Sequence, residues 1–193
     1  KVRFGLHMLT GRHEDRLLFD HQLRLAQIFG YEDASYTLAV EQLMQRYYRA
    51  ARLVRQVSTI LLQNLHARLF PIATQPIPID AEFEAIDELL HVRDERLFER
   101  RPGAMLDAFL HMQRHRELTG MSARTLRALW RNRHRIDAAF RRDPENRRRF
   151  VEFFRAPRGI VHELRRMNLY DILGHYLPPF GRMAALILSG RKE

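Results

Sequence analysis

Residues 35–70 read SYTLAVEQLMQRYYRAARLVRQVSTILLQNLHARLF, a stretch with neither glycine nor proline. Ser35 is a suitable N-cap, and Pro71 supplies a stop. A helix of this length is roughly 50 Å long, so we expect shorter helices to pack on it. The predicted fold class is therefore mainly α, a helical bundle around one long helix at about 35–70. The apolar side chains that recur at helical spacing are Leu43, Met44, Tyr47, Ala50, Ala51, Val54, Leu61, Leu62, Leu65 and Leu69.

Shorter helices are predicted on both sides of this stretch. Val2–Thr10 is expected to end at Gly11, and Asp20 to cap a helix over His21–Phe29 that Gly30 ends. After residue 100, Ser122 and Asp143 are predicted N-caps. The expected helices there cover 104–116, 123–133, 136–140, 144–154 and 159–168, with a short helical turn after 168. We expect Leu126, Leu129 and Trp130 to face inward, and Phe150, Val151, Phe153 and Phe154 to form one apolar face.

The segment between the long helix and residue 100 has a different character. Pro71, Pro76 and Pro78 predict an extended segment at 71–80 that can act as a hinge. The pattern over 83–93 permits either a helix or one small β-hairpin with Asp87 and Glu88 at its turn. We favour the hairpin.

Composition bounds the function without deciding it. The 193 residues carry a formal charge of +10, contain no cysteine, and include no run of about 18 apolar residues that could span a membrane. Only Lys1 and Lys192 are lysines, which leaves 31 arginines among the 33 basic residues. Arginine binds phosphate and carboxylate well, yet these arginines are dispersed among 23 acids, and the signatures of DNA-reading motifs are missing.

The chain lacks the sequence patterns of several catalytic sites. It has no Gly-Ser turn followed by Asp-x-Asp, no adjacent His-Asp pair, no Walker loop, no GxGxxG and no HExxH. His111 and His115 have the spacing of two metal ligands but no third, so we interpret them as solvated surface residues. His7 and His175 lie beside apolar residues and are interpreted as core or interface histidines. We therefore predict no catalytic residue and no metal site in this segment.

Five residues are candidates for facing a ligand or another domain. Arg12 and Arg16 flank Glu14 and Asp15, so they either form a local ion-pair network or approach a nucleotide held by a neighbouring domain. Tyr47, Tyr48 and Arg49 lie on the long helix, where the tyrosines either present hydroxyls to a nucleotide or pack across the helix. We favour packing for the tyrosines.

Clustered arginines at 131, 133 and 135, at 147–149 and at 165–166 permit phosphate binding. Each cluster lies on a predicted helix whose other face is apolar. The simpler interpretation is a solvated helix face.

Two phrases resemble one enzyme family. VRFGLHMLTGRHEDRLLFDHQLRLAQIFGY, followed by VEQLMQRYYRAARLV, and later FRAPRGIVHELRRMNLYDILGHYLPPFGR are similar to the bifunctional PII uridylyltransferase and uridylyl-removing enzymes of bacterial nitrogen regulation. The resemblance covers residues 1–182 and implies a helical linker and scaffold between a nucleotidyltransferase domain and an HD hydrolase domain. Residues 183–193 depart from the family pattern.

The resemblance implies what the full-length enzyme does. Such enzymes transfer UMP from UTP to the PII signalling protein, remove it again, respond to glutamine, and need Mg²⁺ or Mn²⁺. On this hypothesis the segment is cytoplasmic and inactive alone, supports the UTP cleft and positions the hydrolase domain. Its partners are its own catalytic domains, with no membrane and no nucleic acid. The alternative is a standalone arginine-rich helical module that binds nucleic acid or an acidic protein.

Overall fold

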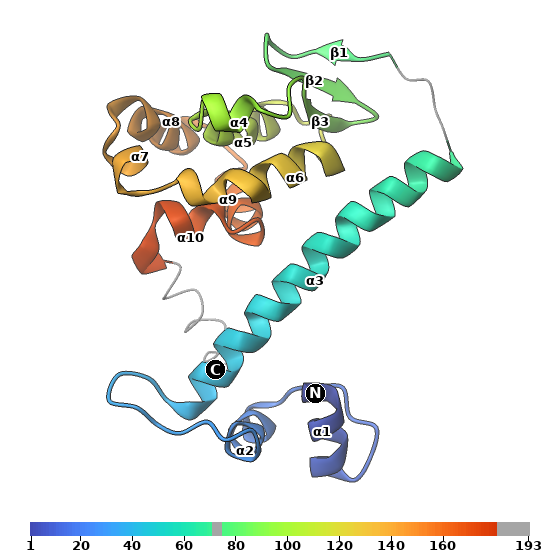
Figure 1. Ribbon diagram of the computed structural model, residues 1–193, viewed down its shortest axis with the longest axis vertical. Helices are drawn as coiled ribbons and strands as arrows, with labels where there is room; N and C mark the ends of the chain where they lie inside the picture. The colour runs from blue at the N-terminus through green and yellow to red at the C-terminus, as the bar shows by residue number, and fades with distance from the viewer. Residues whose placement is uncertain (71–74, 181–193) are drawn as a thin grey trace. The chain divides into compact units, whose positions relative to one another are not determined.

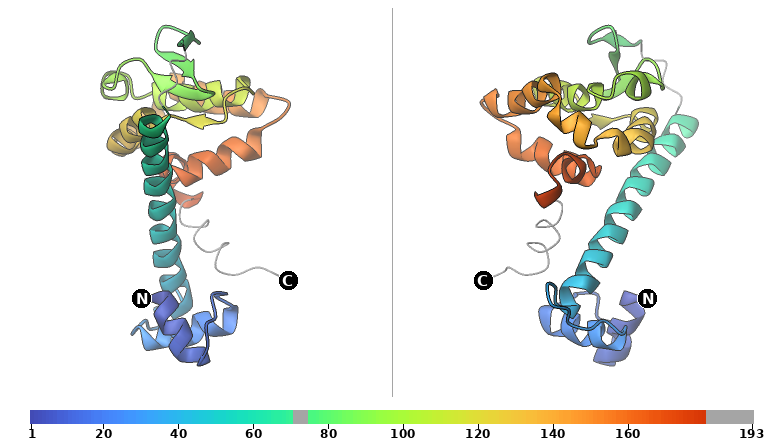
Figure 2. Two further views of the ribbon diagram at one scale, coloured as in Figure 1. Left: turned by 90° about the vertical axis from the view of Figure 1, so that its right-hand side faces the viewer. Right: turned by 60° about the vertical axis from the view of Figure 1, so that its left-hand side comes forward.

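The computed structural model describes residues 1–70 and 75–180. They fall into two compact units, Lys1–Leu53 and the described part of Val54–Gly181. Helix α3 (Ala39–Leu69) contributes residues to both, and Figures 1 and 2 show it as one continuous helix. The mainly helical class is confirmed, with a small sheet added in the second unit.

The first unit contains α1 (Val2–Thr10), α2 (Phe19–Ile28) and the beginning of α3. Gly11 ends α1 with a positive φ of 65°, as predicted. At Gly5 the two short helices approach so closely that a Cβ atom would lie 2.9 Å from the side chain of Leu25. The small core of this unit consists of Leu6, Leu25, Ala26, Ala39 and Leu43.

The predicted N-cap of the long helix was wrong, because α3 begins at Ala39 and not at Ser35. Ala34 and Thr37 bond each other's backbone and make a turn where the helix was expected. The Oδ1 atom of Asp33 accepts a hydrogen bond from the Ala39 amide at 2.7 Å. An acceptor six residues away thus satisfies the helix end in place of a local cap.

The predicted cap at Asp20 was also wrong. Helix α2 begins at Phe19 with Leu18 in the N-cap position, and Asp20 lies in the first turn. An acid there still interacts favourably with the positive end of the helix dipole.

The second unit contains a sheet and several short helices. The strands are β1 (Ile77–Pro78), β2 (Phe83–Ile86), β3 (Leu89–Val92) and β4 (Gly120–Met121). The helices are α4 (Leu97–Arg100), α5 (Ala104–Arg114), α6 (Ala123–Asn132), the 3₁₀ helix η1 (Arg133–Arg135), α7 (Ala138–Arg142), α8 (Pro144–Arg155), α9 (Ile160–Leu169) and α10 (Ile172–Tyr176).

The predicted hairpin is confirmed. Strands β2 and β3 pair antiparallel with Ile86 opposite Leu89, and the turn residues Asp87 and Glu88 have φ values of 51° and 59°. These are the positive angles that a two-residue hairpin turn requires. The order β1-β2-β3-β4 adds two strands that we did not predict, with β4 parallel to β3.

Helix α6 is joined to strand β3 by a buried threonine. The Thr125 hydroxyl donates to the carbonyl of Leu90 at 2.9 Å and accepts from the amide of Val92 at 3.0 Å. The predicted N-cap Ser122 accepts a hydrogen bond from the Thr125 amide, and Asp143 likewise accepts from the Asn146 amide. Both predicted caps are therefore confirmed.

Some side chains predicted to face inward are exposed. Leu126, Leu129, Phe150 and Phe153 are buried in the main core, but Trp130 is 48% exposed. The guanidinium of Arg133 lies 5.1 Å from the centre of the Trp130 ring. Val151 and Phe154 are exposed as well, so the core covers only part of the predicted apolar face of α8.

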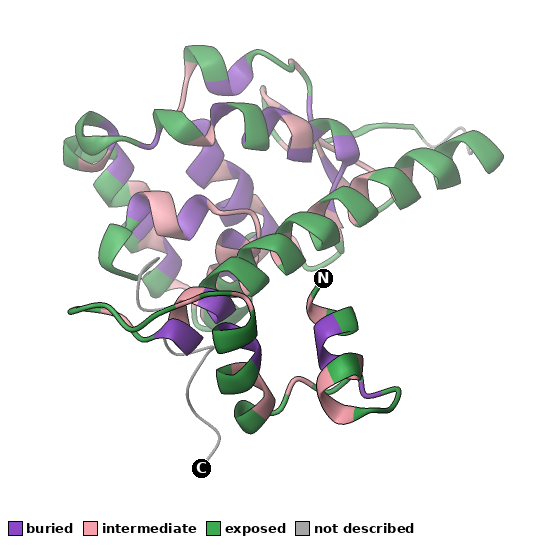
Figure 3. Ribbon diagram, turned by 60° about the horizontal axis from the view of Figure 1, so that its bottom comes forward, coloured by how far each residue is buried: buried purple, intermediate pink, exposed green. Residues whose placement is uncertain are grey.

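Most apolar side chains of α3 are exposed beyond its first turns. Leu43 and Met44 are buried, whereas most apolar residues from Val54 onward are exposed. Figure 3 shows the long helix mainly in green, the colour of exposed residues. The prediction that shorter helices cover these residues is therefore wrong for most of them. In the second unit α3 instead contacts the core through another side, where Ile60 packs and Gln63 donates to the Met121 carbonyl at 3.0 Å.

No helix among the described residues combines the length and apolarity that a membrane crossing needs. The predicted hinge at 71–80 lies outside the described residues at 71–74, and its later part includes β1. The tail at 183–193 lies entirely outside them.

Candidate functional site

Arg12 and Arg16 are brought together by one carboxylate in the turn between α1 and α2. Glu14 is nearly buried, and its two oxygens accept from Arg12 at 3.1 Å and from the Arg16 side chain at 3.3 Å. The backbone N–H of Arg16 also donates to Glu14, and this bond is the main reason that the pKa of Glu14 lies below its usual value. The predicted ion-pair network is thus present, and both guanidinium groups extend into solvent.

Asp15 fastens the same turn to α1. Its carboxylate binds His7 at 3.3 Å and Arg3 at 2.8 Å, and these two hydrogen bonds lower the pKa of Asp15, His7 contributing most. His7 was predicted to be a core or interface histidine; it is half-buried and is not among the residues of the small core. The turn that carries Arg12 and Arg16 is therefore bonded to α1 through Asp15.

Tyr47, Tyr48 and Arg49 follow one another in the first unit's part of α3. The two tyrosine rings meet edge to face with their centres 5.5 Å apart. Tyr48 is half-buried, and burial raises the pKa of its hydroxyl, whereas Tyr47 and Arg49 are exposed. The structure thus brings the candidates together as two groups on different elements, Arg12 with Arg16 and Tyr47 with Tyr48.

A stripe of exposed apolar side chains follows α3 through the second unit. We call the α3 stripe the residues Val54, Val57, Leu61, Leu62, Leu65 and Leu69, which are between 44% and 65% exposed. With 3.6 residues per turn, they lie on the side of the helix opposite Gln56, Ile60 and Gln63, the side chains that contact the rest of the unit. Contiguous exposed apolar surface of this kind is typical of an interface.

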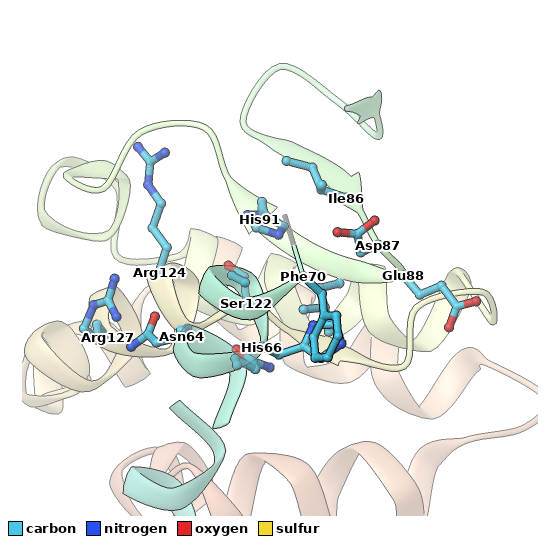
Figure 4. A pocket seen from close by; sticks show the side chains of 14 residues that line it. Asn64, His66, Phe70, Ile86, Asp87, Glu88, His91, Ser122, Arg124 and Arg127 are labelled. Carbon is cyan, nitrogen blue, oxygen red and sulfur yellow. The ribbon is translucent and has the colours of Figure 1, made fainter. Parts of the chain in front are cut away.

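A cavity of about 1040 Å³ lies in the second unit between the end of α3, the hairpin turn and the start of α6. Figure 4 shows Arg124 and Arg127 at one end of it, and Asp87 and Glu88 at the other. Burial lowers the pKa of His91 between them, which favours its neutral form. The sequence did not predict this cavity, because the residues that line it come from separate segments. The one sequence signal of it was the unusual Asp87-Glu88 pair at the hairpin turn.

The side chains in this cavity are suited to binding and not to nucleophilic catalysis. The Ser122 hydroxyl already caps α6 and lies 3.0 Å from the Thr125 hydroxyl, so it is not aimed at a ligand. Gln63 donates to Met121, while its buried Oε1 atom has no partner among the described residues. An acceptor of this kind is available to a bound donor.

The interpretation of His111 as a solvated surface residue was wrong. Its Nε2 atom lies 2.9 Å from Asp80, its ring packs 5.0 Å from that of Phe83, and burial lowers its pKa against the opposing effect of Asp80. His115 instead pairs with Glu117 at 2.9 Å. Within residues 1–70 and 75–180, no three His, Asp or Glu side chains gather into a group that could hold a metal ion by themselves.

The clustered arginines were predicted to lie on solvated helix faces, but some of them form ion pairs with carboxylates and are half-buried. Arg149 donates to Asp107 at 3.1 Å, and Arg166 binds both oxygens of Glu163 at 3.0 and 3.1 Å; both arginines are half-buried. Arg147 and Arg148 are exposed, as predicted.

Comparison with known proteins gives two matches to family models. A family model described as the third domain of uridylyltransferase GlnD matches residues 83–176, and one described as GlnD PII-uridylyltransferase matches residues 1–62. This chain belongs to the GlnD family. The GlnD models thus cover most of each unit, including the candidate residues at 12, 16 and 47–49.

Curated GlnD relatives carry the name bifunctional uridylyltransferase/uridylyl-removing enzyme. Those of Bordetella pertussis and Aromatoleum aromaticum are 54% identical to this chain over 184 and 183 residues, and that of Chromobacterium violaceum is 48% identical over 186 residues. The alignments cover 94–95% of this chain but only 21–22% of the relatives. The chain therefore spans about a fifth of their length. No solved structure matches it.

Proposed function

We propose that this chain is the helical scaffold of a bifunctional enzyme that uridylylates and de-uridylylates the PII protein in response to glutamine. In this proposal residues 1–182 support the UTP cleft of a nucleotidyltransferase domain and position an HD hydrolase domain, and the enzyme works in the cytoplasm. The observation that carries it is the α3 stripe. Family membership supplies the reaction, since the relatives bear the name of this enzyme.

The α3 stripe supports a scaffold because it needs a covering surface. Burying a large apolar side chain from full exposure contributes about 1.5–3 kcal/mol, and the six side chains on this side of the helix are about half exposed, so each would gain about half of that. The opposite side already contacts the second unit through Gln56, Ile60 and Gln63. A helix with one side bound and the other apolar is suited to join two bodies.

We also propose that Arg12, Arg16, Tyr47, Tyr48 and Arg49 face the transferase domain or its nucleotide. The guanidinium groups of Arg12 and Arg16 are exposed yet held by Glu14, which leaves further donors for a phosphate. Tyr47 and Arg49 are exposed on α3. In this proposal Mg²⁺ or Mn²⁺ is held by the catalytic domains.

The test is made in the complete enzyme that carries this segment. Leu65→Asp places a charge within the α3 stripe, and we expect it to lower both UMP transfer to PII and UMP removal at least tenfold. Gln45→Asp, at an exposed position on another side of the same helix, is the matched control and should leave both rates within twofold. Circular dichroism of both variants checks that the helices remain.

Two results would overturn the proposal. One is a Leu65→Asp enzyme with normal rates in both directions. The other is robust UMP transfer or removal by the isolated chain, because a scaffold needs its catalytic domains for either reaction.

The alternative of an arginine-rich binding module has less support. Arg101, Arg149 and Arg166 are engaged by carboxylates and are not free for phosphates. We expect no binding of mixed-sequence DNA or RNA at physiological salt. Tight binding with a steep salt dependence would favour the module instead.

A further inference from the structure

A second cavity lies in the second unit between the end of α5 and the start of α9, with a volume of about 590 Å³. This lies within the range of small-molecule sites. Met112 and Leu118 are its buried apolar residues, and the loop 156–159 forms one wall. The cavity is separate from the one in Figure 4 and from the candidate residues of the first unit.

The loop of this cavity is fixed by contacts of its own. The side-chain Nε2 atom of Gln113 donates to the backbone carbonyls of Phe153 at 3.1 Å and of Arg158 at 3.4 Å. Gly159 takes a φ of 83°, a conformation that other residues rarely adopt. The wall is therefore preformed, which lowers the entropy lost when a ligand binds.

The lining of the cavity carries more positive than negative charge. Four arginines line it, Arg114, Arg116, Arg158 and Arg166, together with His162. Its one carboxylate belongs to Glu163, which is only 2% exposed and already binds Arg166 through both oxygens. Arg114 has a long ion pair with Glu152 at 3.5 Å.

Two of these arginines are available to a ligand. Arg116 and Arg158 are exposed at the rim, and neither forms an ion pair with another residue in the described parts of the chain. A guanidinium group binds phosphate through two parallel hydrogen bonds. Helix α9 also begins at this cavity without a side-chain cap, so its first amides add to the positive potential.

We propose that the cavity between α5 and α9 binds a small phosphate-bearing molecule, up to the size of a mononucleotide. Arg116 and Arg158 contact the phosphate oxygens from two sides. The apolar side chains of Met112 and Leu118 provide a surface for the less polar part of the ligand. Glu163 is a positioning residue that holds Arg166 in the wall.

The test uses the chain with two probes, inorganic pyrophosphate and AMP, which separate an inorganic from a nucleotide source of the phosphate. Binding is measured by calorimetry in 50 mM NaCl, together with the amide NMR signals of 159–162. We expect at least one probe to bind and to shift these signals. The double variant Arg116→Ala/Arg158→Ala should weaken that binding at least tenfold.

The matched control is Arg142→Ala/Arg148→Ala, which removes the same charge from two exposed arginines on α7 and α8 that do not line the cavity. It should change the affinity less than twofold. The proposal is overturned if neither probe binds, or if the control weakens binding as much as the cavity variant, which would indicate general attraction to a basic chain. Circular dichroism confirms the fold of each variant.

Discussion

Replacing Thr125 with valine tests how the sheet and helix α6 are joined. Valine keeps the shape of threonine but removes the hydroxyl that accepts from the Val92 amide. The Leu90 carbonyl keeps a second donor, the Ser122 amide at 3.0 Å, whereas the Val92 amide points away from β2 and is left buried without a partner. An unsatisfied buried donor costs about 1–3 kcal/mol, so we expect a loss of about 2 kcal/mol.

The assay is amide hydrogen exchange followed by NMR, with urea unfolding of the second unit as the second measurement. A loss of about 2 kcal/mol raises the population of the open form by roughly 30-fold. In Thr125→Val the Val92 amide should exchange faster than its neighbours in β3. In Thr125→Ser the hydroxyl remains and only a methyl group is lost, so Val92 should stay as protected as those neighbours.

The reasoning is refuted if Thr125→Val unfolds at the wild-type urea concentration with Val92 still protected. That result would mean that packing alone joins α6 to the sheet. If Thr125→Val lost stability but the Val92 amide did not exchange faster than its neighbours, the lost hydrogen bond could not be the cause of that loss.

Three further changes probe other contacts. Gly5→Val should destabilise the first unit by about 1–3 kcal/mol, because the new side chain would overlap the buried Leu25; urea unfolding read from α1 and α2 NMR signals measures it. Asp107→Asn should cost the second unit about 1–2 kcal/mol in urea unfolding, since its charge is shared by half-buried arginines, whereas exposed Glu145→Gln should cost less than about 0.5 kcal/mol. Burial raises the pKa of Glu163 to about 7, so the folded state binds more protons than the unfolded one between about pH 4.5 and 7. The second unit should lose stability as pH rises through this range, and Glu163→Gln should flatten that part of the pH profile; an unchanged profile would contradict this.

The helices could be predicted where their signals are local. Ser122 and Asp143 cap helices as expected because a cap needs only the next three residues. Ser35 failed because Asp33 and the Ala34–Thr37 turn compete for the same backbone groups. Both Ser35 and Asp33 could accept hydrogen bonds from the first amides of the helix, and the sequence pattern alone could not decide between them.

The remaining features depend on contacts between distant segments. Strand β4 has two residues and exists because it pairs with β3, some thirty residues earlier, so periodicity gives no sign of it. His111 was misread because its partner Asp80 belongs to another segment. The network of Arg12, Glu14 and Arg16 was predictable because its members are two residues apart. Both cavities were missed because their linings come from several elements.

The hairpin turn has a consequence for protein engineering. Asp87 and Glu88 both take the positive φ angles that asparagine and glycine adopt with less strain. An Asn-Gly replacement should therefore strengthen the hairpin, yet it would remove both carboxylates from the acidic end of the cavity in Figure 4. A variant selected for heat resistance and one selected to keep the charge of this cavity would thus differ at the same two positions.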